Sequence, residues 1–112
     1  MEQASGETQA VEAKITLRRD AEDDAQERQI VVKLNGERKG ELMFGDTMTI
    51  PVKAGQHRLT VDNTWNWKTL ELDVKAGEHI RFRTMSRVGK FTWFLVSLFG
   101  AGPMYVSIER EE

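Results

Sequence analysis

Two nearly identical hexapeptides decide the fold predicted for this chain: Val52-Lys53-Ala54-Gly55-Gln56-His57 and, twenty-two residues later, Val74-Lys75-Ala76-Gly77-Glu78-His79. Both lie between runs in which apolar and polar residues alternate, the pattern of half-buried β-strands. Glycine adopts positive φ without steric cost, so an extended chain can reverse its direction at each copy. We therefore expect each hexapeptide to form the turn of a β-hairpin.

Outward from these two turns, the alternation predicts about eight short strands. In each of them the apolar side chains share one face, which can be buried while the other face is wetted. The predicted inward sets are Ile15 and Leu17; Ile30, Val32 and Leu34; Leu42 and Phe44; Met48, Ile50 and Val52; Leu59 and Val61; Leu70, Leu72 and Val74; Ile80, Phe82 and Thr84; and Met104, Val106 and Ile108.

Turn residues between these strands add further expectations. Asn35-Gly36 is the strongest hairpin signal in the chain, because both residues tolerate positive φ. Gly40 indicates a bulge in the strand that follows, and Gly45-Asp46 indicates another turn. Pro51 has no N–H to donate, so its strand is expected at a sheet edge or with that position facing solvent.

The two hexapeptide hairpins also predict a register. In the second hairpin, acidic residues of one strand would face basic residues of the next, and such exposed pairs contribute about 0.2–1 kcal/mol each. The expected cross-strand pairs are Val74–Ile80, Asp73–Arg81 and Glu71–Arg83 in the second hairpin, and Leu59–Ile50 and Val61–Met48 in the first.

These strands and turns predict an antiparallel two-layer β-sandwich of the immunoglobulin-like type. A chain of 112 residues supports one core, so we expect a single domain over residues 13–110. Residues 1–12 carry too little apolar surface to offset the entropy of ordering them, and are expected to form a disordered tail. The run from Arg19 to Arg28 is charged throughout and is expected to be a solvated connection.

Composition excludes several classes of function. Sixteen basic and eighteen acidic residues give a net charge of −2, which disfavours general nucleic-acid binding. The absence of cysteine excludes disulfides and thiolate chemistry. The first ten residues lack the pattern of a signal peptide, and the longest apolar run, residues 91–99, is about half of the roughly twenty residues that span a bilayer. We therefore expect no transmembrane segment and a cytoplasmic location.

No arrangement of residues predicts catalysis. The histidines of the two hexapeptides are the first candidates for a metal site. Their phases oppose each other, because His57 alternates with the inward Leu59 whereas His79 alternates with the outward Arg81. A Gly-x-Ser-x-Gly elbow and a glycine-rich phosphate loop are both missing from the sequence, and paired carboxylates occur only on wet faces and in the charged connection. We predict no enzyme, no cofactor and no metal site.

Aromatic residues form the candidate binding patch: Trp65, Asn66 and Trp67 in one predicted turn, and Trp93 and Phe94 downstream. Both segments are expected at the end of the sandwich opposite the hexapeptides. Tryptophan offers a large apolar face and a polar N–H, which suit a sugar ring or a protein partner. The alternative is that these rings plug the open end of the sandwich.

Residues 91–99 are apolar on both faces of a strand, unlike every other predicted strand. Their spacing also fits a short helix or apolar turn that ends at Gly100. Any part that stays exposed would be an association surface, either for a second copy in a weak homodimer or for a membrane interface.

A family resemblance is carried by the apolar strand that ends in Asn35-Gly36, by Gly40, and by the pattern V-x-A-G-x-H-x-L-x-V that begins at Val52. This order resembles the PEGA group of immunoglobulin-like sandwich domains and covers roughly residues 28–85. The proline of the PEGA signature is absent where Glu41–Phe44 stand. The resemblance implies a non-enzymatic accessory or surface-associated module, and it carries over no catalytic residues.

The sequence therefore predicts a non-enzymatic interaction or structural module that binds a protein partner. The alternative is a sandwich that binds a carbohydrate or another small ligand on Trp65 and Trp67.

Overall fold

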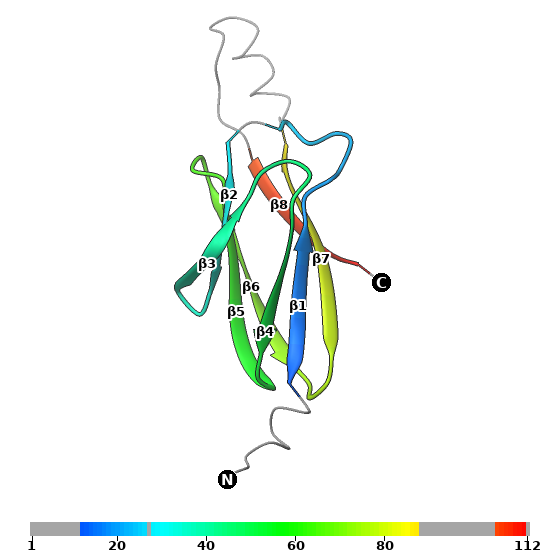
Figure 1. The fold of residues 1–112 in the computed structure, drawn as a ribbon. Helices are drawn as coiled ribbons and strands as arrows, with labels where there is room; N and C mark the ends of the chain where they lie inside the picture. Colours follow the sequence, from blue (N-terminus) through cyan, green and yellow to red (C-terminus); the bar gives the residue numbers. More distant parts are fainter. Residues whose placement is uncertain (1–11, 27, 88–104, 112) are drawn as a thin grey trace, which may run out of the picture.

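The computed structural model describes residues 12–26, 28–87 and 105–111. These residues form eight β-strands in two four-stranded sheets, and they include no helix (Figure 1). One sheet has the order β4-β1-β7-β8 and the other β3-β2-β5-β6. The strands are β1 (Ala13–Arg18), β2 (Ile30–Leu34), β3 (Glu37–Leu42), β4 (Thr47–Val52), β5 (Gly55–Asp62), β6 (Trp67–Val74), β7 (His79–Arg87) and β8 (Tyr105–Glu111).

A single hydrophobic core joins the two sheets, so the predicted two-layer arrangement and the eight strands are confirmed. All eight strands contribute buried apolar side chains to it, and the largest that are fully buried include Phe82, Ile15 and Leu17. Among the described residues the predicted inward phase is correct for nearly every strand, while Met104 of the last predicted set lies outside them. Phe44 is the exception, because β3 ends at Leu42 and leaves the Phe44 side chain 40% exposed in the following turn.

The two hexapeptides are not hairpin turns, and this prediction was wrong. Each carries the chain from one sheet to the other, the first from β4 to β5 and the second from β6 to β7. A glycine-containing reversal can join neighbours within one sheet or strands in two packed sheets. Only the pairing partners of the strands distinguish these cases.

The cross-strand pairs expected for those hairpins are replaced by others. Ile50 faces Ile15 of β1, and Leu59 faces Leu34 and Leu70. Glu71 faces Arg58 within the β5–β6 hairpin, and its Oε2 accepts a hydrogen bond from Arg58 Nε at 2.9 Å. Asp73 faces Gln56, while Arg81 and Arg83 of β7 face Glu111 and Glu109 of β8.

The sheet that contains β1 is mixed, which corrects the expectation of a fully antiparallel fold. β1 is antiparallel to β4 but parallel to β7, with Ile15 beside Ile80 and Leu17 beside Phe82. The second hexapeptide brings the chain into β7 at the end where β1 also begins, so both strands run in the same direction (Figure 1).

The turns and the bulge predicted from single residues are confirmed, unlike the predicted pairing of strands. Asn35 and Gly36 have φ of 54° and 85° and form the two-residue turn between β2 and β3, as predicted. The register shifts beside Gly40, which confirms the bulge. A Cβ added at Gly40 would lie 2.5 Å from Met48 Cε, so the end of the Met48 side chain would have to shift to accept a larger residue there. Pro51 is exposed on β4, an edge strand.

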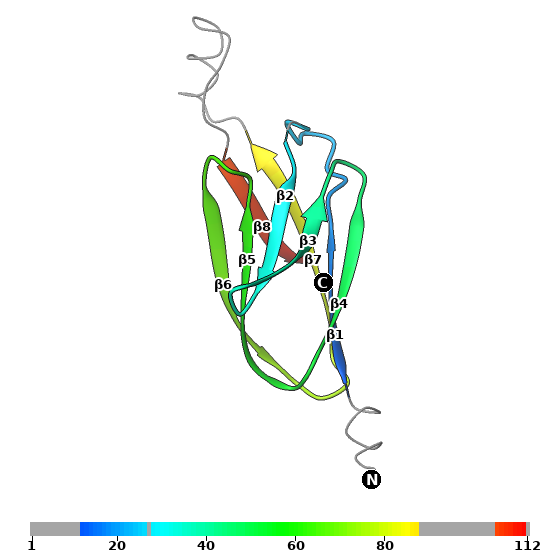
Figure 2. The same ribbon diagram turned by 60° about the vertical axis from the view of Figure 1, so that its left-hand side comes forward.

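The connections gather at two ends of the sandwich (Figures 1 and 2). The two hexapeptides lie at one end, which we name the hexapeptide end. The connections 19–29, 43–46 and 63–66 lie at the other, together with Arg87 and Tyr105, where β7 ends and β8 begins. We name this second end the loop end.

Ion pairs on the outer face of the β4-β1-β7-β8 sheet join β8 to β1. Arg18 donates from Nε and Nη2 to the two carboxylate oxygens of Glu111, at 3.1 and 2.6 Å. Arg83 Nη2 lies 3.9 Å from the same carboxylate. The hydrogen bond from Arg18, assisted by the nearby positive charges, holds the pKa of Glu111 below its ordinary value of 4.5, although partial desolvation opposes this shift.

Acid is expected to weaken this attachment of β8. Because the pKa of Glu111 is lower in the folded than in the unfolded state, its stabilising contribution is complete above about pH 4.5 and is lost as the pH falls through the lowered value. The difference in unfolding free energy between the wild type and Glu111→Gln should therefore shrink over that range. Urea unfolding between pH 7 and pH 2 measures this, and a difference that stays constant would contradict the assignment.

Candidate functional site

The exposed large apolar side chains of the described ranges gather toward the loop end. They are Met43, Phe44, Trp65 and Trp67, with 49%, 40%, 43% and 67% of their surface exposed. Met43 and Phe44 lie in the β3–β4 connection, Trp65 in the β5–β6 turn, and Trp67 is the first residue of β6. Trp93 and Phe94, the other two members of the predicted patch, lie outside the described residues, as does the whole segment 91–99.

Trp65 is held against the neighbouring connection. The guanidinium carbon of Arg28 lies 5.6 Å from the centroid of the Trp65 ring, the range of a cation–π contact. Arg28 is in the β1–β2 connection, so this contact joins two connections that come from different parts of the chain. The indole still keeps 43% of its surface exposed at the tip of the loop end.

Asn66 has a structural contact that its position between two tryptophans did not indicate. Its Oδ1 accepts a hydrogen bond from the backbone N–H of Val106 at 2.8 Å. Val106 belongs to β8 in the other sheet, so Asn66 links the β5–β6 turn across the sandwich.

Asn63 organises the same turn, and sequence analysis missed it. This residue is 1% exposed, and its Oδ1 accepts hydrogen bonds from the backbone N–H groups of Trp65 and Asn66, at 3.1 and 3.0 Å. Its Nδ2 donates to Ser86 Oγ at 3.2 Å. The signal available in the sequence was an asparagine two residues before Trp65, because asparagine often hydrogen-bonds backbone groups that follow it in a turn.

The β1–β2 connection is organised by a buried ion pair, which corrects the expectation that this connection is solvated throughout. Arg19 donates from Nε and Nη2 to the two carboxylate oxygens of Asp24 at 2.9 and 3.1 Å, and both side chains are fully buried. Arg19 Nη1 also donates to the backbone oxygens of Arg28 and Leu42, at 2.7 and 2.8 Å. Arg19 continues the inward phase of Ile15 and Leu17, which was the signal that could have identified it.

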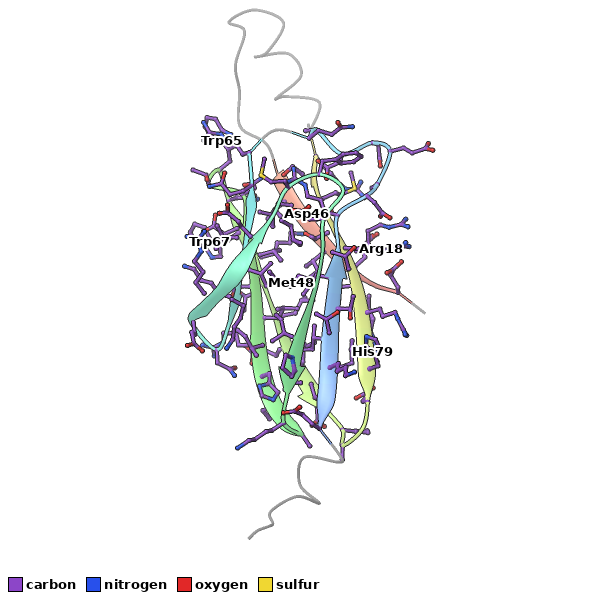
Figure 3. The ribbon with its side chains drawn as sticks, viewed as in Figure 1. Arg18, Asp46, Met48, Trp65, Trp67 and His79 are labelled. Carbon is purple, nitrogen blue, oxygen red and sulfur yellow. The ribbon has the colours of Figure 1, made fainter. Side chains whose placement is uncertain are left out.

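Trp67 lies on a different surface from Trp65. Figure 3 shows Trp65 at the tip of the loop end and Trp67 beside the β3-β2-β5-β6 sheet. Trp67 faces Asp62 across the β5–β6 pair, and both alternate with inward residues, so both point to the outside of this sheet. A hollow of about 510 Å³ opens there, lined by Val31, Lys33, Arg38, Asp62, Thr64 and Trp67.

The two histidines are separated by the fold, since His57 is on β5 of one sheet and His79 on β7 of the other. A hydrogen bond joins His57 Nε2 to the backbone oxygen of Lys53 at 2.7 Å. His79 is exposed, as its phase predicted, and its Nε2 lies 2.7 Å from Thr16 Oγ1. No group of three or more metal-ligating His, Cys, Asp or Glu side chains occurs within residues 12–26, 28–87 and 105–111.

The part of the chain that the structure describes includes no helix long and apolar enough to cross a membrane. The chain matches no protein-family model, no curated protein and no solved structure. The candidate sites therefore depend on their own geometry.

Proposed function

We propose that this protein is a non-enzymatic interaction module that binds a protein partner at the loop end. The observation that carries this proposal is the location of Met43, Phe44 and Trp65 at the same end of the sandwich, where three exposed apolar side chains extend from two connections. Exposed large apolar side chains are a feature of interaction surfaces, and tryptophan is enriched among the residues that dominate binding energy.

Rigid support of these side chains favours binding. The Arg19 side chain bonds to Arg28 of the β1–β2 connection and to Leu42 at the end of β3, and Asn63 bonds to the turn that contains Trp65. Backbone bonds add to this, because Gly45 N donates to Arg19 O and Ala25 N donates to Ser86 O. A surface that is already ordered loses less conformational entropy when a partner binds.

The resemblance to PEGA domains supports the same proposal, since it implies an accessory module of the immunoglobulin-like type. We propose that the β-sandwich is of the immunoglobulin-like type. We also propose a cytoplasmic location, with which a sequence without cysteine agrees.

A triple variant tests the proposal. Met43→Ser/Phe44→Ser/Trp65→Ser is expected to weaken partner binding at least about tenfold, because truncating central apolar anchors typically costs more than 1 kcal/mol each. The matched control is Ala54→Ser/Gln56→Ser/Ala76→Ser, which changes three exposed residues at the hexapeptide end. The partner is captured from source cells by crosslinking to the wild type and then titrated against all three proteins.

The proposal predicts that the control retains the affinity of the wild type. Equal affinity of the triple variant, or the absence of any partner that binds the wild type directly, would contradict it. Circular dichroism and thermal unfolding show whether each variant is folded.

A second candidate function is binding of a carbohydrate or another small ligand on the tryptophans, and one observation favours it. The hollow beside Trp67 has a volume within the usual range of ligand sites and combines an aromatic face with several polar side chains. Titration of an oligosaccharide panel against tryptophan fluorescence distinguishes the two functions. A shift or quench of emission is expected if the rings bind sugars, and a flat response across the panel leaves the interaction module alone.

A further inference from the structure

The hollow beside Trp67, which we name the Trp67 hollow, crosses the strands of the β3-β2-β5-β6 sheet on its outer face. Val31 and Lys33 of β2 and Arg38 of β3 line one part of it, and Asp62, Thr64 and Trp67 line the other. Trp67 is 67% exposed, so a large apolar face is open to solvent beside the polar side chains of the hollow.

Two positive charges face each other within this hollow. Lys33 and Arg38 are direct cross-strand partners in the β2–β3 hairpin, at the point where the bulge shifts the register. Like charges placed directly opposite each other destabilise a strand pair. An anion bound between them would remove this repulsion.

Neighbouring acids compensate only part of this charge. Arg38 Nη2 lies 2.6 Å from Glu41 Oε2, in a pair that is exposed on both sides. Among the residues that the structure describes, no acid forms an ion pair with Lys33. Asp62 also lines the hollow, and its Oδ1 accepts a hydrogen bond from the backbone N–H of Thr64 at 2.8 Å. The hollow therefore combines the aromatic face of Trp67 with two cationic side chains, Lys33 and Arg38. It also contains the carboxylate of Asp62 and the hydroxyl of Thr64.

We propose that the Trp67 hollow binds an acidic saccharide, in which a sugar ring packs against Trp67 and its carboxylate or sulfate lies between Lys33 and Arg38. Asp62 and Thr64 would hydrogen-bond the hydroxyls of the sugar, which both donate and accept. Ammonium and guanidinium groups form charge-assisted hydrogen bonds with such anions, and these are stronger than neutral ones. This inference rests on the second candidate function and names its ligand class and its specificity residues.

A matched pair of ligands tests the role of charge. Tetragalacturonate and its fully methyl-esterified form share the same sugar rings, but only the first is anionic. In calorimetric titrations, we expect the ester to bind the wild type at least about tenfold more weakly, since each charge-assisted hydrogen bond contributes more than a neutral one. A sulfated neutral tetrasaccharide, titrated in parallel, determines whether sulfate can replace the carboxylate.

Protein variants test the assigned residues. Lys33→Gln/Arg38→Gln should reduce the affinity for tetragalacturonate to that for the ester, and should leave the ester affinity unchanged. The control Lys53→Gln/Lys75→Gln removes the same charge from exposed residues of the hexapeptide end and should change neither affinity. Trp67→Ala should abolish binding of both ligands, whereas Trp65→Ala should retain both. If Trp67→Ala fails to fold, Trp67→Phe keeps an aromatic face and should bind more weakly than the wild type.

The outcomes separate this inference from the functions proposed above. Equal affinity for acid and ester, with loss of both in Trp67→Ala, would overturn the selectivity for anions and leave carbohydrate binding intact. No binding of either form or of the sulfated sugar to the folded wild type would overturn this inference and the second candidate together. Neither result affects the protein interaction, which is tested at Met43, Phe44 and Trp65. Binding of ADP or hexaglutamate as tightly as tetragalacturonate, with the same dependence on Lys33 and Arg38, would overturn the saccharide class.

Discussion

Arg19→Met is expected to lower the free energy of unfolding by about 3–5 kcal/mol, because removing one partner of a buried ion pair leaves the other charge uncompensated. The side chains of Arg19 and Asp24 are both fully buried, and Arg19 also satisfies the backbone oxygens of Arg28 and Leu42. For a domain near this size, each kcal/mol corresponds to about 4 °C or more, so the thermal midpoint should fall by at least about 12 °C. Thermal and urea unfolding measure both quantities.

Two further variants show whether burial is the cause. Arg58→Met breaks an ion pair of similar length, 2.9 Å, but with both side chains about two-thirds exposed, and should cost about 1 kcal/mol or less. Arg19→Met/Asp24→Leu removes both buried charges and should regain part of the stability lost in the single variant. Equal losses for Arg19→Met and Arg58→Met would contradict the role assigned to the buried pair.

Asn63→Ala is expected to cost about 1–3 kcal/mol, since it leaves the partly buried N–H groups of Trp65 and Asn66 without the acceptor that Asn63 Oδ1 provides. Its effect should also be local. The amide hydrogens of these two residues should exchange faster with solvent, because the turn that presents Trp65 loses its internal support. Urea unfolding and amide hydrogen exchange are the measurements.

Ser86→Ala is the control for Asn63. This substitution removes the Ser86 Oγ that accepts a hydrogen bond from Asn63 Nδ2 at 3.2 Å. It leaves Asn63 Oδ1, which accepts the hydrogen bonds of the turn, in place. A smaller loss of stability and unchanged exchange at Trp65 and Asn66 are expected. Equal behaviour of the two variants would mean that the turn does not depend on Asn63 Oδ1.

These two buried polar groups connect the stability of the domain to its proposed function. Arg19 and Asn63 both lie below the loop end, where they join connections that are distant in sequence. Loss of either should therefore also weaken partner binding by disordering Phe44 or Trp65. A partner that binds Asn63→Ala as tightly as the wild type would indicate that the order of the turn is not required.

Trp65 and Trp67 illustrate what adjacency in sequence cannot determine about a site. They are two residues apart and were predicted to form one patch with Asn66. The turn between β5 and β6 places Trp65 at the tip of the loop end, whereas Trp67 already belongs to β6 and faces outward, where it lines the same hollow as Lys33 and Arg38. These two basic residues come from another hairpin, so no pattern around the tryptophans indicated them.

Local sequence patterns were enough to predict the properties that depend on neighbouring residues. Alternation identified the buried face of each strand, because side chains of a strand point to opposite sides in turn. Asn35-Gly36 specified a tight hairpin, Gly40 a bulge and Pro51 an edge position, since each follows from the φ range or the hydrogen-bonding capacity of the residue itself.

Which strands are neighbours could be seen only in the folded chain. A short glycine-containing reversal has the same local chemistry whether it closes a hairpin or crosses between sheets, so the two hexapeptides could not reveal that they change sheet. The opposite charges of Glu71 and Arg83 suggested a pairing, yet Glu71 pairs with Arg58, because the register is set by burial of the apolar face and not by exposed ion pairs. Arg19 lies in a charged run but on the inward phase. Its burial became possible only where Asp24 and the backbone oxygens of Arg28 and Leu42 met to compensate its charge.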